Sequence, residues 1–176
     1  MPDGIAVDAN VMKKFNQDLL AAEQSLSGIL VAQLLQRYGL VVDLTGKVQH
    51  EWFSQCPNAL FKEWFVQNMK LGLIRMVKPS IPEQHKRELV IGLGFPRRGY
   101  DLVYVAVANV TERKYIVTED LDFFDPTQKG ADHETKERIK RERKCAVCAY
   151  LRKQMNIVVG TPQQASAELL GLNAVE

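Results

Sequence analysis

Short apolar runs alternate along this chain with longer segments that have helical periodicity. The apolar runs predict β-strands at 4–8, 40–43, 73–77, 114–118 and 156–160. The periodic segments predict helices at about 11–21, 25–38, 46–55, 58–71, 82–92, 101–112, 133–155 and 162–170. Continuous apolar strands separated by helices indicate a parallel sheet covered on both faces. The pattern therefore predicts an α/β fold in which the carboxyl ends of the strands lie along one edge.

Residues with known positional preferences mark several helix ends. Gly39 is expected to end the helix 25–38, and Thr45 is expected to be the N-cap of the helix that carries Glu51. Pro162 suits the first position of the last helix, with Thr161 as its cap.

The segment 102–110 fits two secondary structures. Its β-branched residues are typical of a strand. We favour a buried helix, because the alanines in this segment suit close packing and another predicted strand follows four residues later. Asp101 then stands at the start of a helix.

Length and composition favour one globular domain over residues 1–176, since 46% of the residues are hydrophobic. No apolar run reaches the roughly 18 residues that a membrane span needs, and the N-terminus does not resemble a signal peptide. Three cysteines, an odd number, are typical of a reducing compartment. These features predict a soluble cytoplasmic protein without a membrane partner.

A polar, charged stretch at about 126–150 is predicted to be a helical insertion within the domain. Val147, Leu151 and Met155 recur at a spacing of four and should dock the end of this region on the sheet, while its first half should project into water.

The net charge of the chain is only +2, but charge is unevenly distributed. The segment 136–144 is strongly basic, and the segment 119–125 before it is acidic. Such a layout suits a site that holds both cations and a polyanion, or a solvated helix face.

Four carboxylates stand at places where folding alone gives no reason for them. Asp8 closes the first apolar run, Asp120 follows the fourth, Glu51 lies within an apolar helical segment, and Asp101 opens another. A carboxylate at the edge of a core costs desolvation energy unless a positive group meets it. Convergence of these acids would make a site for a hard divalent cation such as Mg²⁺ or Mn²⁺. Such ions support phosphodiester hydrolysis.

The motifs around these acids resemble those of PIN domains. The segment 5–10 (Ile-Ala-Val-Asp-Ala-Asn) is similar to the first strand of that family, which ends in Asp-x-Ser/Thr/Asn, and 117–123 (Val-Thr-Glu-Asp-Leu-Asp-Phe) resembles its Thr-x-Asp-x-Asp-Phe segment. The segments 50–52 and 100–108 resemble the two helices that carry the other acidic residues, and 158–162 resembles the last strand and its exit.

The resemblance implies a three-layer α/β/α sandwich with a five-stranded parallel sheet and a Mg²⁺- or Mn²⁺-dependent endoribonuclease. It implies that Asp8, Glu51, Asp101 and Asp120 bind metal, that Asp122 supports a second ion or orients water, and that Asn10 and Thr118 help position the ligands. Many family members are toxins that a small antitoxin protein inhibits, and others process RNA. A homodimer is a further expectation from the family.

Other interpretations of the chain remain open at this stage. RNA contacts are expected from Arg97, Arg98, Lys140, Arg141 and Arg143, for which the alternative is a polar surface. Cys145 and Cys148 form a lone CxxC that could hold zinc with Cys56 and a histidine, although core or inert thiols fit better. The protein could also be a catalytically weak PIN-like module that binds RNA or protein. A phosphatase acting on small molecules is disfavoured, because Asp8-Ala9-Asn10 lacks the second aspartate that an aspartyl phosphatase needs after its first strand.

Overall fold

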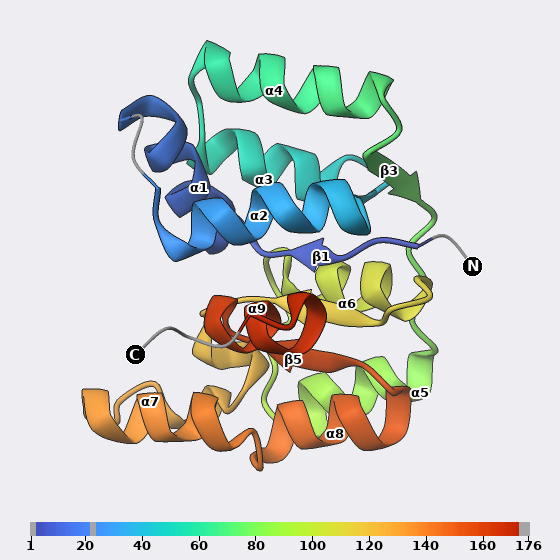
Figure 1. Ribbon diagram of the computed structural model, residues 1–176. Coiled ribbons are helices and arrows are strands. Elements are labelled where there is room, and N and C mark those ends of the chain that lie inside the picture. Colours follow the sequence, from blue (N-terminus) through green and yellow to red (C-terminus); the bar gives the residue numbers. More distant parts are fainter. Residues whose placement is uncertain (1–2, 22–23, 173–176) are drawn as a thin grey trace.

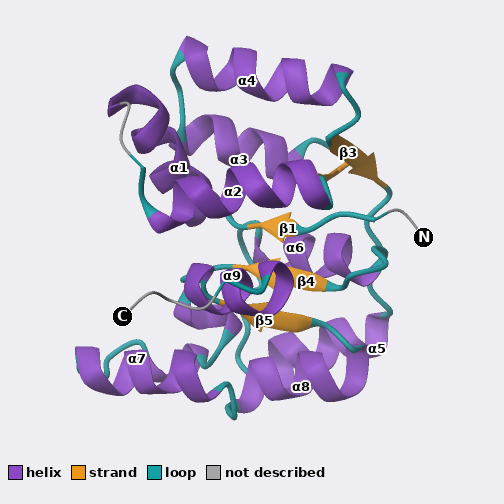
Figure 2. Cartoon of the chain, in the orientation of Figure 1, coloured by secondary structure: helices purple, strands orange, loops and turns teal. Residues whose placement is uncertain are grey.

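The computed structural model describes residues 3–21 and 24–172, which form an α/β fold (Figures 1 and 2). The strands are β1 (Ala6–Val7), β2 (Leu40–Asp43), β3 (Ile74–Val77), β4 (Tyr115–Val117) and β5 (Val158–Gly160). The α-helices are α1 (Ala9–Ala21), α2 (Leu26–Arg37), α3 (Lys47–Gln55), α4 (Ala59–Lys70), α5 (Glu83–Arg87), α6 (Asp101–Asn109), α7 (His133–Glu142), α8 (Ala146–Met155) and α9 (Pro162–Leu170). A π-helical turn, η1 (Glu88–Gly92), extends α5, and two 3₁₀ turns, η2 (Leu121–Phe123) and η3 (Pro126–Gln128), follow β4.

All strand pairs are parallel, as the apolar runs predict. One sheet has the order β1-β4-β5, with Val7 opposite Val117 and Val117 opposite Gly160. A second sheet pairs β2 with β3. An isolated parallel bridge between Ile5 and Leu40 connects the two sheets. The structure therefore has parallel sheets of three and two strands where the sequence predicts one sheet of five.

Helices lie on both sides of the strands (Figure 2). Helix α6 contacts β1, β2 and β4, and α9 contacts β5 and α2. Leu40, Trp52 and Tyr104 are among the fully buried side chains of the core. The indole Nε1 of Trp52 donates to the carbonyl oxygen of Val7 at 3.1 Å. This bond fixes α3 against the end of β1 and brings Glu51 close to Asp8.

The expected helix boundaries are confirmed in most places. Segment 102–110 lies largely in helix α6, and Asp101 is the first residue of that helix. Gly39 follows α2 with a positive φ of 78°, which favours glycine. Thr161 caps α9 by accepting from the amide of Gln164 in a capping box.

The predicted cap at Thr45 is wrong. Gly46 is the N-cap residue of α3, with a φ of 77° and no side-chain cap bond. The carboxylate of Asp43 binds the helix start instead, because it accepts from the amide of Val48 at 2.7 Å and from that of Lys47 at 3.2 Å. The hydroxyl of Thr45 donates to Asp43 and so supports the cap without forming it.

The single helix predicted over 133–155 is also wrong, because the chain breaks between α7 and α8. Arg143 adopts a left-handed conformation with a φ of 51°. From there its guanidinium forms an ion pair with Glu168 of α9 and donates to the carbonyl oxygen of Val159 at 3.3 Å. The contacts of Arg143 with the rest of the domain thus accompany the break, and Cys145 begins the next helix as its N-cap.

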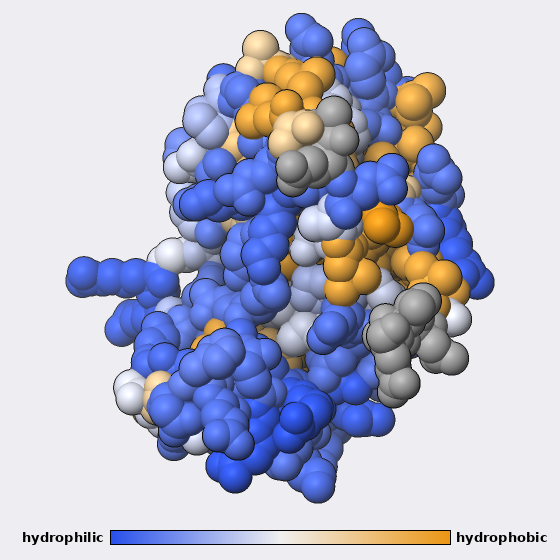
Figure 3. Space-filling view, turned by 60° about the vertical axis from the view of Figure 1, so that its left-hand side comes forward, coloured by the Kyte–Doolittle hydropathy of each residue, from blue (hydrophilic) through white to orange (hydrophobic). Residues whose placement is uncertain are grey.

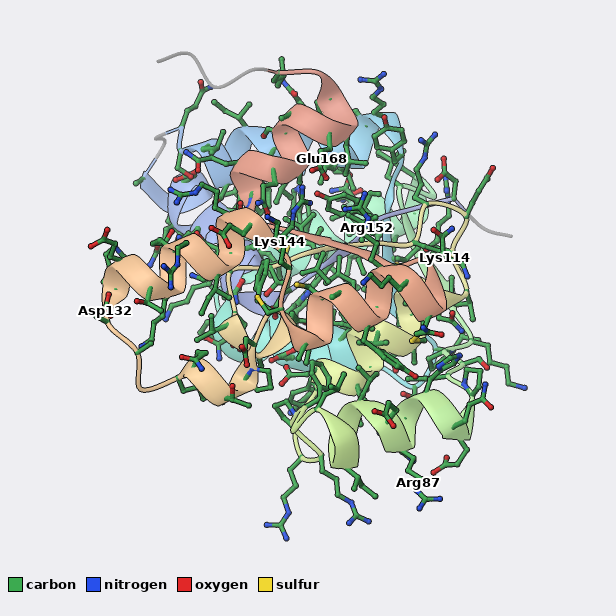
Figure 4. All side chains as sticks on the ribbon, turned by 90° about the horizontal axis from the view of Figure 1, so that it is seen from below. Arg87, Lys114, Asp132, Lys144, Arg152 and Glu168 are labelled. Atoms are coloured by element: carbon green, nitrogen blue, oxygen red, sulfur yellow. The ribbon has the colours of Figure 1, made fainter. Side chains whose placement is uncertain are left out.

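The segment 126–150 has the two halves that the sequence predicts. Helix α7 buries no residue, whereas α8 buries Val147, Leu151 and Met155 against the domain. The face of the molecule in Figure 3 is mainly hydrophilic, and its hydrophobic residues form separate patches. Figure 4 shows Asp132 at the outer end of α7 and Lys144 just after its other end. Among the described residues, no helix has both the length and the apolar character of a membrane span.

Candidate functional site

The four acids singled out in the sequence line one cavity of about 440 Å³. They come from four separate elements: Asp8 follows β1, Glu51 lies on α3, Asp101 begins α6, and Asp120 follows β4. The complete lining is Asp8, Ala9, Asn10, Lys13, Lys14, Gln17, Glu51, Gln55, Asp101 and Asp120. The cavity therefore lies where β1 and β4 end, at the edge of the sheet that the parallel topology predicts.

Asp8 is held in place by three bonds. Its amide donates to the carbonyl oxygen of Val117 at 2.9 Å, which continues the pairing of β1 with β4. The hydroxyl of Thr118 donates to Asp8 Oδ2 at 2.5 Å, and the side-chain amide of Asn10 donates to the same oxygen at 2.9 Å. The other carboxylate oxygen, Oδ1, accepts neither bond. The carboxylate is thus oriented on one side, while only 5% of the residue is exposed.

Thr118 also connects Asp8 with the segment that carries Asp120. The hydroxyl oxygen of Thr118 accepts from the amide of Asp120 at 2.9 Å while its proton goes to Asp8. Asp120 Oδ1 in turn accepts from the amide of Asp122 at 3.0 Å. One buried threonine therefore sets the positions of two carboxylates relative to each other.

Glu51 is oriented by a hydrogen bond from helix α6. The hydroxyl of Tyr104, a buried residue of α6, donates to Glu51 Oε2 at 2.7 Å. Tyr104 lies one helical turn after Asp101, so α6 contributes one carboxylate and positions a second. Asp101 itself is half-buried.

The acids are close enough to affect one another's ionisation. Burial raises the pKa of Asp8 to about 7, and the charges of Glu51, Asp120 and Asp101 act in the same direction against the lowering effect of the Thr118 hydroxyl. Burial likewise raises the pKa of Asp101 to about 7, with contributions from Asp120, Asp122 and Glu51. Burial and the charge of Asp120 raise the pKa of Glu51 against the Tyr104 bond. Without a cation, the cluster does not carry its full negative charge near neutral pH.

Asp122 lies beside this cluster and does not line the cavity. It is 5% exposed, and its Oδ1 is buried with no hydrogen-bond partner among the described residues. Its Oδ2 forms an ion pair with the ammonium of Lys129 at 2.7 Å. An unsatisfied buried carboxylate oxygen is costly unless a further donor or cation meets it.

The predicted RNA-binding cations do not line the carboxylate cavity. Arg97 and Arg98 are exposed in the loop before Asp101. Lys140 lines a neighbouring cavity and pairs with Glu137 at 3.2 Å, and Arg141 is exposed on α7. Arg143 is engaged by Glu168, so its guanidinium already has a structural partner.

Sequence reasoning missed two cations that line the cavity with the acids. Lys13 and Lys14 of α1 line the cavity, and Lys14 also pairs with Glu119. Asn10, Lys13, Lys14 and Gln17 follow the i, i+3, i+4, i+7 spacing of one helix face. That spacing would have placed both lysines beside Asp8 if the helix had been predicted to begin at residue 9 instead of 11.

The carboxylate oxygens are chemically suited to a hard cation, but their side chains are not arranged as a complete metal-binding group. Among the described residues, no group of three or more His, Cys, Asp or Glu side chains is already set to hold a metal ion. The four carboxylates nevertheless lie near one another, because they line one cavity and because the charges of neighbouring carboxylates raise the pKa of Asp8 and Asp101. All the donors are oxygens, which suits Mg²⁺ or Mn²⁺.

The zinc alternative gains no support from the structure. Cys56, Cys145 and Cys148 are free thiols, and Cys56 and Cys148 are buried. The thiol of Cys148 lies 3.5 Å from the carbonyl oxygen of Cys145, as expected for a packed helical cysteine. Burial raises the pKa of both Cys145 and Cys148, which disfavours the thiolate that zinc requires.

No protein-family model, curated protein or solved structure matches this chain. The resemblance to PIN domains therefore depends on the motifs around the acids.

Proposed function

We propose that this protein is a divalent-metal-dependent endoribonuclease with a PIN-like fold. The observation that carries the proposal is the meeting of Asp8, Glu51, Asp101 and Asp120 at one cavity, although they are far apart in the sequence. Gathering these four acids at one cavity, with Asp8 buried and the other three half-buried, has no benefit for folding, since burial and nearby negative charges raise the cost of ionising Asp8, Glu51 and Asp101. A cation bound among them would remove that cost.

In this proposal the four carboxylates hold Mg²⁺ or Mn²⁺, with Asp122 available to a second ion. A divalent ion so held supplies an activated water and neutralises charge on the phosphodiester. Thr118 and Asn10 keep Asp8 oriented, and Tyr104 does the same for Glu51. Lys13 and Lys14 line the same cavity, so their charges can attract the phosphate backbone toward the acids.

We also propose that the two sheets form one five-stranded parallel sheet. If the bridge between Ile5 and Leu40 is counted as a pairing, the two sheets combine in the order β3-β2-β1-β4-β5. That order would give the five-stranded sandwich that the PIN resemblance implies. The resemblance also makes a toxin inhibited by a small antitoxin protein, and a homodimer, the expected context.

The exposed arginines before α6 give a prediction about substrate affinity. Changing Arg97 and Arg98 together to alanine should weaken RNA binding and lower the slope of log Kd against log salt by about 1 to 2, because each arginine that no longer neutralises a phosphate reduces the counterion release by roughly one. Fluorescence anisotropy with labelled single-stranded RNA at several salt concentrations measures this slope. Changing Arg37 of α2 and Arg152 of α8 to alanine is a charge-matched control away from this loop, and an equal effect of both double variants would contradict a specific role for the loop.

The proposed activity is tested by incubating the protein with labelled single-stranded RNA and, separately, with DNA of the same sequence. We expect RNA to be cleaved with Mn²⁺ and to stay intact with EDTA. Cleavage that is unaffected by EDTA would contradict the proposal. RNA binding without cleavage under any divalent ion would favour the catalytically weak binding module.

A further inference from the structure

Lys129 places a positive charge beside the proposed metal centre from outside its cavity. It follows the 3₁₀ turn η3 in the polar loop that leads to Asp132, the residue that Figure 4 shows at the outer end of α7. Its ammonium lies 2.7 Å from Asp122 Oδ2. The lysine side chain is 61% exposed, whereas that of Asp122 is 7% exposed. A long side chain on the surface thus neutralises a carboxylate that is almost fully buried.

The charge of Lys129 reaches the cluster itself. Burial and the neighbouring carboxylates raise the pKa of Asp101, and the charge of Lys129 acts against them. The charge of Asp122 raises the pKa of Asp101, so the charges of both Lys129 and Asp122 act on Asp101. The hydrogen bond to Asp122 in turn raises the pKa of Lys129, which keeps the amine charged.

The pairing leaves half of Asp122 unsatisfied. Lys129 binds Oδ2, while Oδ1 is buried without a hydrogen-bond partner among residues 3–21 and 24–172. A buried carboxylate with one unpartnered oxygen next to other carboxylates is suited to a cation that can contact both of its oxygens or bridge to a neighbour. A single ammonium on an exposed stem meets this requirement only in part.

We propose that Lys129 is a tethered cation that competes with a divalent ion for Asp122. This inference rests on the proposed metal-dependent function, because it concerns the filling of the same centre. The ammonium stands at the end of an exposed side chain and can return to water, so an arriving ion that meets the buried carboxylate in its place can displace it. The ion must nevertheless break the pair and then bind beside a positive charge. The centre should therefore fill in two unequal steps, with a stronger first ion held by the cavity acids and a weaker second ion that engages Asp122.

The competition is measured by titrating the full-length protein with Mn²⁺ and following the free ion by its electron paramagnetic resonance signal. In Lys129→Met the second step should tighten about tenfold, which is the effect of removing one nearby unit charge from the site of a divalent ion. The first step should change less, since the cavity acids do not pair with Lys129. Lys144→Met removes the same charge from the end of α7, and it should titrate like the wild type.

Asp122→Asn gives the second part of the test. It should weaken the second step in both backgrounds, and Asp122→Asn combined with Lys129→Met should titrate like Asp122→Asn alone, because competition needs the carboxylate. A Lys129→Met titration that matches Lys144→Met would overturn the competition while leaving the proposed function intact. A titration without any bound Mn²⁺ in all of these proteins would instead overturn the proposed function, and the competition with it.

Discussion

Asparagine in place of Asp8 or Asp101 should lower RNA cleavage in Mn²⁺ by roughly a hundredfold or more. Each change keeps the size of the side chain and removes one negative charge and one oxygen ligand from the cavity. The amide oxygen introduced by Asp8→Asn could still accept the hydrogen bond from Thr118, so the loss would come from the missing ligand and not from a missing hydrogen bond. Initial rates of cleavage of a labelled RNA at saturating Mn²⁺ measure the effect.

The matched control is Glu63→Gln, which removes a carboxylate from an exposed position of α4 away from the cavity. This variant should cleave RNA at the wild-type rate. Asp8→Asn and Asp101→Asn proteins that remain as active as Glu63→Gln would show that these acids do not form the reaction centre.

The stability of the metal-free protein should fall as pH rises from about 4 to about 7. Unfolded Asp8 and Asp101 lose their protons near pH 3.8, whereas the folded groups have a pKa of about 7. Over this window the folded state binds more protons than the unfolded state, so rising pH favours unfolding. For buried Asp8 the difference corresponds to roughly 4 kcal/mol, and solvent screening reduces the share of the half-buried Asp101. Urea denaturation in EDTA at a series of pH values measures this slope.

Asp8→Asn isolates the contribution of this acid. Other groups make stability rise with pH instead. For Asp43, burial acts to raise the pKa, but hydrogen bonds from Thr45 and from the amides of Val48 and Lys47 lower it overall. The ionised form of Asp43 therefore favours folding at higher pH. The difference between wild type and Asp8→Asn cancels such common terms. The variant should be the more stable protein at pH 8 in EDTA, and added Mn²⁺ should restore the stability of the wild type but not improve the variant equally. Equal pH profiles for the two proteins would contradict the buried, crowded environment of Asp8.

The position of the acids favours metal binding at the expense of stability. The cavity places acids where they destabilise the empty protein, and the same placement suits them to bind a cation. Loss of activity together with a gain in metal-free stability in Asp8→Asn would therefore separate a functional role of the acid from a structural one.

The parts of the site that follow from strand topology could be predicted from the sequence. Asp8 and Asp120 follow apolar runs, and parallel strands bring such positions to one edge. Glu51 and Asp101 could be singled out as acids in or beside apolar segments, but only the family resemblance indicated that they face the same site, because nothing in their local pattern fixes the direction in which their helices face. The bond from Trp52 to Val7 and the bond from Tyr104 to Glu51 supply that direction in the structure.

Features that depend on contacts between distant residues could not be predicted. The break at Arg143 accompanies an ion pair with Glu168, 25 positions later, and helical periodicity contains no sign of it. The pairing of Lys129 with Asp122 depends on how a polar loop folds back, which a run of charged residues does not specify. The cap of α3 comes from Asp43 instead of Thr45, because both residues suit a cap and only the path of the turn decides between them.

The central claim, that Asp8, Glu51, Asp101 and Asp120 together bind a divalent ion, is tested most directly by a crystal grown with Mn²⁺. An anomalous difference map recorded near the manganese absorption edge locates the ion without assumptions about its ligands. The claim predicts a peak within coordination distance of carboxylate oxygens from at least three of these four residues. A map without a peak in this cavity at saturating Mn²⁺, or with peaks only at other places on the surface, would contradict it.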